Sequence, residues 1–146
     1  DVSRIRDWWG GKFIIKGILE PDDAVKALDV GADAIIVSNH GGRQLDQTSS
    51  TISMLPKIVE AVKGKSAIWL DGGIRSGHDI LKAVALGADN TLIGRAMSYG
   101  LAANGISGCE KTLNILHTEL DMTMALCGHK NLKEVDDSIL KIESDF

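Results

Sequence analysis

The residues best suited to chemistry lie together in one short segment of the sequence, from Ser38 to Asp46. His40 and Arg43 are three positions apart, and Gly41 and Gly42 separate them. An imidazole exchanges a proton near neutral pH, a guanidinium binds a carboxylate through two parallel hydrogen bonds, and glycine lets the backbone approach a ligand closely. This combination predicts proton abstraction from an anionic substrate.

An apolar run, residues 34 to 37, comes directly before this segment. A short run of β-branched residues that ends in polar residues and glycines is typical of a buried parallel strand. In α/β folds the ligand lies at the carboxyl ends of such strands. We therefore expect a strand to deliver His40 and Arg43 to the mouth of a site.

The sequence also contains an internal repeat. Residues 23 to 33 match residues 79 to 89, and each copy ends in Gly-Ala-Asp. Each copy is expected to form a strand, a polar or glycine-rich turn, a helix, the Gly-Ala-Asp turn and a second strand. The pattern predicts four strands, near residues 13 to 17, 34 to 38, 67 to 71 and 91 to 94.

Helices are predicted between these strands. Pro21 suits a first helical turn, Gly31 a helix end, and Ser76 with Asp79 a capping box. Helical spacing of apolar residues predicts two more helices, over residues 50 to 63 and 113 to 127. We also expect Trp8 and Trp9 to pack in a helix before the first strand.

Alternating strands and helices imply a parallel sheet, which is either a small open sheet or part of an eight-stranded barrel. A dinucleotide-binding open sheet would need a G-x-G-x-x-G turn after its first strand, and residues 16 to 21 do not form one. The pattern favours the barrel.

Composition narrows the function classes. The chain has 146 residues, which we expect to form one domain over residues 1–146, and a net charge of −4 with its basic residues dispersed. Nucleic acid is therefore not an expected partner. Cys109 and Cys127 have neither metal-ligand nor redox spacing, so we expect reduced cysteines, no metal site and a cytoplasmic protein. No apolar segment reaches the roughly 20 residues that span a bilayer.

Four segments resemble successive signatures of the FMN-dependent 2-hydroxy acid dehydrogenases and oxidases. The segments are residues 15–19, 37–46, 71–77, and 86–89 together with 93–96, and the resemblance extends from about Ser3 to Glu134. It implies an α/β fold, the C-terminal half (strands 5 to 8) of a (β/α)8 TIM barrel. Full members of the family have an N-terminal half that resembles nothing in this chain, and that half supplies further flavin contacts and an aspartate that pairs with the catalytic histidine.

The resemblance also implies roles for individual residues. His40 would be the base that takes the substrate's proton, and Arg43 would hold the substrate's carboxylate. Lys16 would lie beside the N1 and O2 edge of FMN. The other residues expected to bind FMN are Ser38, Asp71, Gly73, Arg75, Gly94 and Arg95. For Arg75 and Arg95 the residues agree independently, because both follow strands in glycine-rich turns that suit a phosphate.

The expected function is the FMN-dependent oxidation of an L-2-hydroxy acid by the full-length protein. The segments near residues 15–19 and 32–46 look most similar to bacterial lactate dehydrogenases, so L-lactate, oxidised to pyruvate, is the expected substrate. Two alternatives stay open: a non-catalytic half-barrel fragment, and another phosphate-binding flavin or nucleotide barrel enzyme. We further expect a homo-oligomer, and association with the inner face of the membrane through regions outside this chain.

Overall fold

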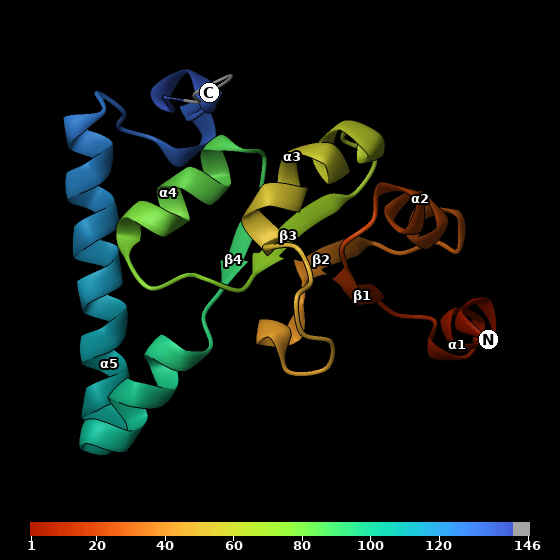
Figure 1. Cartoon of the computed structure of the whole chain (residues 1–146), viewed down its shortest axis with the longest axis horizontal. Coiled ribbons are helices and arrows are strands. Elements are labelled where there is room, and N and C mark those ends of the chain that lie inside the picture. Colours follow the sequence, from red (N-terminus) through yellow and green to blue (C-terminus); the bar gives the residue numbers. More distant parts are fainter. Residues whose placement is uncertain (142–146) are drawn as a thin grey trace. The chain divides into compact units, whose positions relative to one another are not determined.

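The computed structural model describes residues 1–141, which divide into two compact units (Figure 1). The first unit comprises Asp1–Gly73 and Gly87–Leu92. The second comprises Ile74–Leu86 and the chain from Ile93 onward. The expectation of a single domain over residues 1–146 stays a prediction.

The first unit contains a four-stranded parallel sheet. Its strands are β1 (Ile14–Ile18), β2 (Ala34–Ser38), β3 (Ala67–Asp71) and β4 (Asn90–Leu92). They are hydrogen-bonded in the order β1-β2-β3-β4, so each strand lies beside its neighbour in sequence. The four predicted strands are confirmed, with β1 displaced by one residue and β4 by one or two. A doubly wound open sheet reverses its strand order, whereas a barrel wall keeps it, so this order agrees with the barrel.

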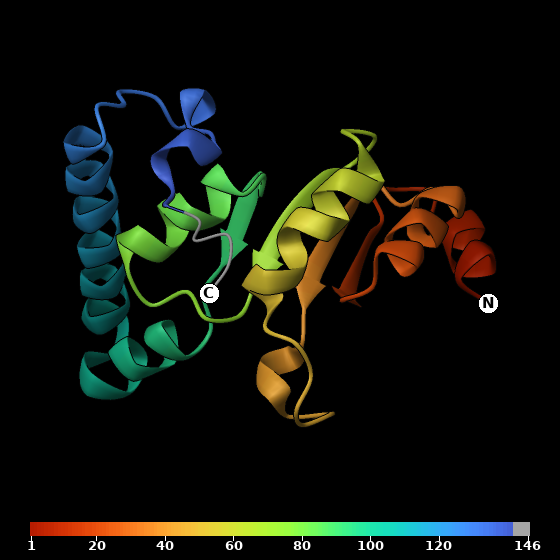
Figure 2. The same ribbon diagram turned by 45° about the horizontal axis from the view of Figure 1, so that its top comes forward.

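Two helices, α2 (Pro21–Asp29) and α3 (Thr51–Val62), pack on one face of this sheet (Figure 2). Both begin and end where the sequence predicts, to within two residues. The packed layer contains apolar side chains that are at most 4% exposed: Ile35, Val37, Leu55, Ile58, Val62, Ile68 and Leu70. The alternate residues of β3, Ala67, Trp69 and Asp71, are only half-buried, so they lie on the opposite face.

The internal repeat has a structural counterpart at the Gly-Ala-Asp turns. Asp33 exchanges two hydrogen bonds with Phe13: its Oδ2 accepts from the backbone N–H at 2.9 Å, and its own N–H donates to the carbonyl at 2.8 Å. Asp89 makes the same pair of bonds with Ile68, at 2.7 and 2.8 Å. Each aspartate thus ties the turn before one strand to the start of the neighbouring strand. Both ties lie at the amino ends of the strands, away from the carboxyl ends where a barrel binds its ligand.

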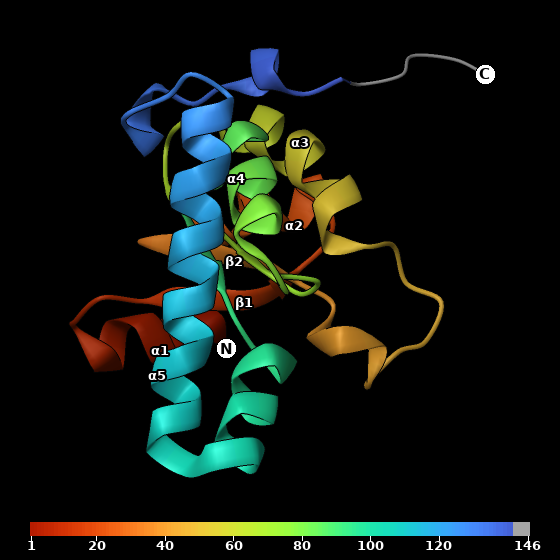
Figure 3. The same ribbon diagram turned by 90° about the vertical axis from the view of Figure 1, so that its left-hand side faces the viewer.

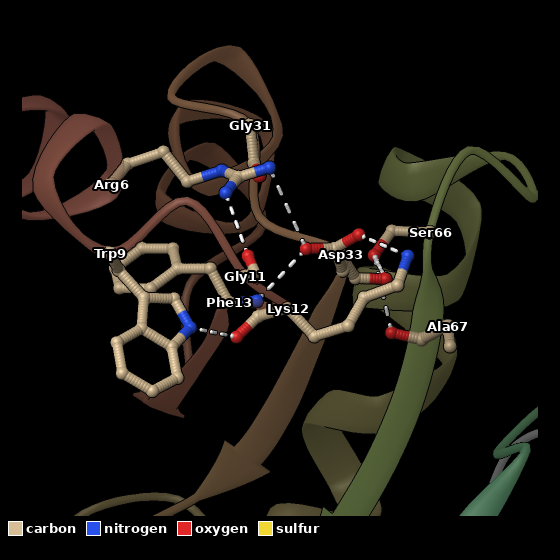
Figure 4. A network of polar contacts seen from close by, with 9 residues as sticks. All are labelled: Arg6, Trp9, Gly11, Lys12, Phe13, Gly31, Asp33, Ser66 and Ala67. Atoms are coloured by element: carbon tan, nitrogen blue, oxygen red, sulfur yellow. Dashed lines mark hydrogen bonds and ion pairs between the residues drawn. The ribbon is translucent and has the colours of Figure 1, made fainter.

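Asp33 also anchors helix α1 (Val2–Trp9), as Figure 4 shows. The Asp33 carboxylate lies 2.7 Å from Lys12 Nζ and 3.9 Å from Arg6 Nη2. Arg6 in turn donates to the carbonyls of Gly31 and Gly11, at 3.0 and 2.8 Å. These bonds hold α1 beside the turn that precedes β2.

The expected packing of Trp8 and Trp9 is wrong for this chain. The helix is present, but Trp8 is 74% and Trp9 65% exposed. Trp9 Nε1 donates to the carbonyl of Lys12 at 2.8 Å, and Arg4 lies over the Trp8 ring, 5.0 Å from its centroid. Local polar and cation–π contacts, rather than burial, therefore orient both rings.

We expect replacement of Asp33 by asparagine to remove part of the protein's acid sensitivity. Hydrogen bonds from Lys12 and from the Phe13 N–H hold the pKa of Asp33 below its usual value. A carboxyl group whose pKa is lower in the folded state than in the unfolded state stabilises the fold at pH values above its unfolded-state pKa of about 4. That stability is lost as the pH falls through the folded-state pKa. Tm measured from pH 7 to pH 3 should fall less steeply in Asp33→Asn, while Asp121→Asn, an exposed change of the same charge, should follow the unmodified protein.

The 146-residue chain expressed by itself should self-associate. In the described residues β1 pairs only with β2 and β4 only with β3, so both outer strands present unpaired backbone groups. Such edges favour pairing with another strand. Size-exclusion chromatography with light scattering should show a dimer or larger species, and a strict monomer over a wide concentration range would contradict the prediction. We also expect this isolated chain to bind FMN weakly or not at all.

The second unit contains α4 (Gly77–Ala85), α5 (Arg95–Leu126) and two 3-10 helices, η2 (Leu132–Glu134) and η3 (Asp137–Ile139). The predicted capping box is present: Ser76 Oγ accepts from the N–H of Asp79 at 3.2 Å, and Asp79 Oδ2 accepts from the N–H of Ser76 at 2.9 Å. Leu81, Ala85, Met124 and Val135 form the small core between α4, α5 and the segment that follows.

Helix α5 is longer than the sequence predicts. The expected helix begins near residue 113, whereas α5 begins at Arg95 and bends sharply at Asn104 and Gly105 (Figure 3). Past the bend the chain turns back, and the backbones of Gly100 and Gly108 lie so close that neither position has room for a Cβ. The three glycines that permit the bend and the close contact interrupt the apolar spacing on which the prediction depends. Within the described part of the chain, no helix has both the length and the apolar character needed to cross a membrane.

Candidate active site

Three polar side chains meet at the carboxyl ends of β1, β2 and β3. Ser38 is the register partner of Asp71, and Lys16 lies two residues before the end of β1. Lys16 Nζ is 2.6 Å from Asp71 Oδ2 and donates to Ser38 Oγ at 3.0 Å. The Ser38 hydroxyl donates to the same Asp71 oxygen at 2.7 Å. The structure therefore brings together three of the predicted FMN-binding residues in one hydrogen-bonded cluster.

The electrostatic balance of this cluster keeps Asp71 ionised. Burial raises the pKa of Asp71. Hydrogen bonds from Lys16 and Ser38, together with the nearby charges of Lys16 and His40, lower this pKa by more than burial raises it, so the net pKa lies below the usual value. The side chains of Lys16 and Asp71 are 36% and 20% exposed. A partly accessible ammonium is therefore held at the strand ends by a neighbouring carboxylate, where it can also face a bound anion.

His40 begins the short 3-10 turn His40–Gly42 directly after β2. Its N–H donates to Ser38 Oγ at 3.1 Å, and its ring packs on Gly17, where an added Cβ would lie 3.2 Å from Cε1. The side chain is exposed, and its ring nitrogens make no hydrogen bond within residues 1–141. The imidazole is thus placed beside the Lys16 cluster and is free to take a proton.

Arg43 ends the same turn and is exposed to solvent. It makes no ion pair with any described residue, so its guanidinium is available to an anionic ligand. Asp46, in the same loop, accepts the N–H of Gln47 at 2.9 Å. This local hydrogen bond supports the backbone of the loop.

Gly72 and Gly73 follow β3 with φ of 114° and 84°, values in the left-handed region that favours glycine. A Cβ on Gly72 would lie 3.2 Å from Thr51 Oγ1, and Thr51 donates to the Gly72 carbonyl at 3.3 Å. No atom lies within 4 Å of the corresponding Cβ position on Gly73. The predicted FMN-binding residue Gly73 therefore leaves open space, while Gly72 is packed against the start of α3.

The other predicted FMN-binding residues belong to the second unit. Arg75 precedes α4, and Gly94 and Arg95 begin α5. The two helix starts differ. At α4 the Gly77 N–H donates to Glu119 at 2.8 Å and the Asp79 N–H to Ser76, whereas Gly94 gives α5 no side-chain cap and its first turn contains no acidic residue. The start of α5 has the N–H groups and positive dipole that bind a phosphate.

Sequence reasoning did not identify Asn39, Thr51 and Gly17 as parts of this site. Asn39 Oδ1 accepts the Gly41 N–H at 3.0 Å, Thr51 fixes the Gly72 turn, and Gly17 makes room for the His40 ring. Asn39 could have been found from its place two positions before a pair of glycines, since asparagine commonly closes such turns. Thr51 and Gly17 carry no local signal, because their contacts join residues more than 20 positions apart.

A family model described as "FMN-dependent dehydrogenase" matches residues 1–142. The chain belongs to this family. It is 48% identical to L-lactate dehydrogenase of Pectobacterium atrosepticum over 143 residues, which is 97% of this chain and 37% of that protein.

Solved structures of mandelate oxidase match the fold of this chain. One, with benzoyl-formic acid, superposes with a TM-score of 0.87 at 45% identity and covers 90% of this chain and 39% of that one. A tyrosine-to-phenylalanine mutant with the monooxide FMN adduct matches equally well and covers 42% of that chain. The chain thus spans about two fifths of the relatives that it matches. With four consecutive parallel strands, it is part of a (β/α)8 barrel.

Proposed function

We propose that the protein containing this chain oxidises an L-2-hydroxy acid to the 2-oxo acid with FMN as the electron acceptor. The observation that carries the proposal is the cluster at the ends of β1 to β3, where Lys16 stands beside His40 and an unpaired Arg43 follows in the same turn. A base, a carboxylate-binding group and a cation for an anionic ring are the groups that this reaction requires.

The residues fit FMN by the chemistry of their donors. The Lys16 ammonium suits a ring edge that becomes negative on reduction, the Asp71 carboxylate suits a hydroxyl group, and Gly73 leaves open space. In the second unit Arg75, Gly94 and Arg95 suit a phosphate. When bound, FMN would accept two electrons and one of the two protons that the substrate loses.

The chain's own residues perform the other tasks. Arg43 binds the substrate carboxylate through its guanidinium fork, and His40 takes one proton from the substrate as the two electrons leave it. The resulting imidazolium lies in the field of the Asp71 carboxylate, since the charge of His40 is among those that lower the pKa of Asp71.

L-lactate is the leading substrate. The lactate dehydrogenase relative matches 97% of this chain at 48% identity, against 90% at 45% for mandelate oxidase. L-mandelate is the second candidate, because solved mandelate oxidase structures match the fold of this chain with a TM-score of 0.87. The proposed function implies that the ligand is a small 2-hydroxy acid. We also propose that the protein is a homo-oligomer, located in the cytoplasm or at the inner face of the membrane.

Purification of the whole protein, with its absorption spectrum, tests the proposal directly. We expect bound FMN, bleaching of the flavin absorbance by L-lactate without oxygen, and a larger kcat/KM for L-lactate than for L-mandelate. A protein without flavin would indicate a non-catalytic half-barrel. A flavin that no 2-hydroxy acid reduces would indicate a different barrel enzyme.

A further inference from the structure

We propose that Ser38 is a positioning residue whose hydroxyl fixes the backbone of His40 and thereby aims its imidazole, an inference that rests on the function proposed above. Ser38 is the last residue of β2 and is 1% exposed. His40 follows two positions later, outside the strand and exposed to solvent. The hydrogen bond between them joins a rigid element to a group that must be held in place to act.

The backbone of His40 needs such a support. Its φ is 53°, in the left-handed region that side chains with a Cβ disfavour. Gly41 and Gly42 continue in the same region, with φ of 68° and 71°. Asn39 holds the glycines, because its side chain accepts the Gly41 N–H and its carbonyl accepts the Gly42 N–H, both at 3.0 Å. Within the described residues, the bond from His40 N to Ser38 Oγ at 3.1 Å is the hydrogen bond that reaches His40 itself.

The Ser38 hydroxyl is suited to this role because its bonding capacity is full. A hydroxyl has one proton to donate and two lone pairs to accept with. The proton goes to Asp71 Oδ2 at 2.7 Å, and the two lone pairs receive Lys16 Nζ at 3.0 Å and the His40 N–H at 3.1 Å. Because the hydroxyl proton of Ser38 is donated to Asp71, Ser38 Oγ can only accept a hydrogen bond from His40. Asp71 therefore orients the Ser38 hydroxyl, and this hydroxyl holds the backbone N–H of His40.

The ring of His40 shows what this alignment achieves. It lies against Gly17, one residue beyond Lys16, where the absence of a Cβ leaves space for Cε1. The ring reaches Gly17 of β1 with the His40 backbone in its left-handed conformation. Loss of the Ser38 hydroxyl should let the backbone relax and displace the base from the position next to Lys16.

The test compares Ser38→Ala, Ser38→Thr and a control, Ser66→Ala, in the flavin-loaded protein. Ser66 is half-buried, precedes β3 at the amino end of the sheet and also uses its hydroxyl for backbone contacts, to Asp33 O at 3.1 Å and Ala67 O at 3.4 Å. Three quantities are measured for each variant: kcat per bound flavin, KM for the hydroxy acid, and hydrogen exchange of the amides in residues 38–46.

We expect Ser38→Ala to lower kcat per bound flavin about tenfold or more, the scale of a misplaced catalytic group, with little change in KM because Arg43 is untouched. Exchange at the His40 amide should become faster. Ser38→Thr, which keeps the hydroxyl, should restore kcat and slow exchange, and Ser66→Ala should resemble the unmodified protein. In a His40→Gln background, Ser38→Ala should cause no further loss of kcat.

Three results would overturn the inference: a kcat for Ser38→Ala equal to that of Ser66→Ala, an unchanged His40 exchange rate, or a loss that persists fully in the His40→Gln background. If Ser38→Ala does not fold, Ser38→Cys replaces it, because the thiol has a similar volume but is a weak hydrogen-bond acceptor. The same results are then expected of Ser38→Cys, and the same results would overturn the inference. Failure of the proposed function is distinguishable, because the unmodified protein would then turn over no 2-hydroxy acid, while the exchange measurement still reports on the hydrogen bond.

Discussion

Replacement of His40 by glutamine should lower kcat of the flavin-loaded protein by about a hundredfold or more, with the flavin still bound. Glutamine keeps a similar size and a hydrogen-bonding end but cannot take a proton near neutral pH, and general base catalysis is commonly worth about 10² to 10⁴ in rate. The imidazole is exposed beside Gly17 and makes no hydrogen bond with another described side chain, so its loss should disturb the fold little. Steady-state kinetics with L-lactate, normalised to flavin absorbance, measure the effect.

Two variants make this result specific. His117→Gln, an exposed histidine of α5, should leave kcat unchanged. Arg43→Lys should chiefly raise KM, because an ammonium cannot reproduce the two parallel hydrogen bonds of a guanidinium to a carboxylate. Turnover by His40→Gln close to that of the unmodified protein would mean that another group is the base.

The second large effect concerns the phosphate of FMN. Replacement of either Arg75 or Arg95 by alanine should weaken FMN binding to the whole protein by about 2 to 4 kcal/mol, which is about 30- to 1,000-fold in Kd. Arg95→Ala should weaken FMN binding more than Arg75→Ala. Arg95 is the first residue of α5, where no side chain caps the free N–H groups, whereas the start of α4 beside Arg75 is already satisfied by Ser76 and Glu119.

Fluorescence titration of the flavin-depleted protein with FMN measures these affinities. Lys111→Ala, the removal of an exposed positive charge further along α5, serves as the control for net charge and should leave Kd unchanged. Full retention of flavin by both arginine variants after dialysis would show that the phosphate is bound elsewhere.

Local patterns were sufficient for the sheet and most of its helices. A strand or a helix turn depends on neighbouring residues, so the apolar run before Ser38, Pro21 at the start of α2 and the Ser76 capping box could be read directly. The repeat at Gly-Ala-Asp also predicted equivalent turns, which the paired bonds of Asp33 and Asp89 confirm. The first part of α5 could not be predicted, because the glycines that allow its close packing interrupt the spacing of apolar residues on which a helix prediction depends.

The sequence by itself determined the element order, the family and the residue types of the site, since these follow from spacing along the chain. Only the tertiary structure decided how those residues meet. Lys16, Ser38 and Asp71 come from three strands, and their bonds exist because parallel register aligns the strand ends. The left-handed backbone of His40 is supported by the Ser38 hydroxyl, which donates its proton to Asp71 on the neighbouring strand. Side chains far apart in sequence acquire their chemistry from a geometry that no local pattern encodes.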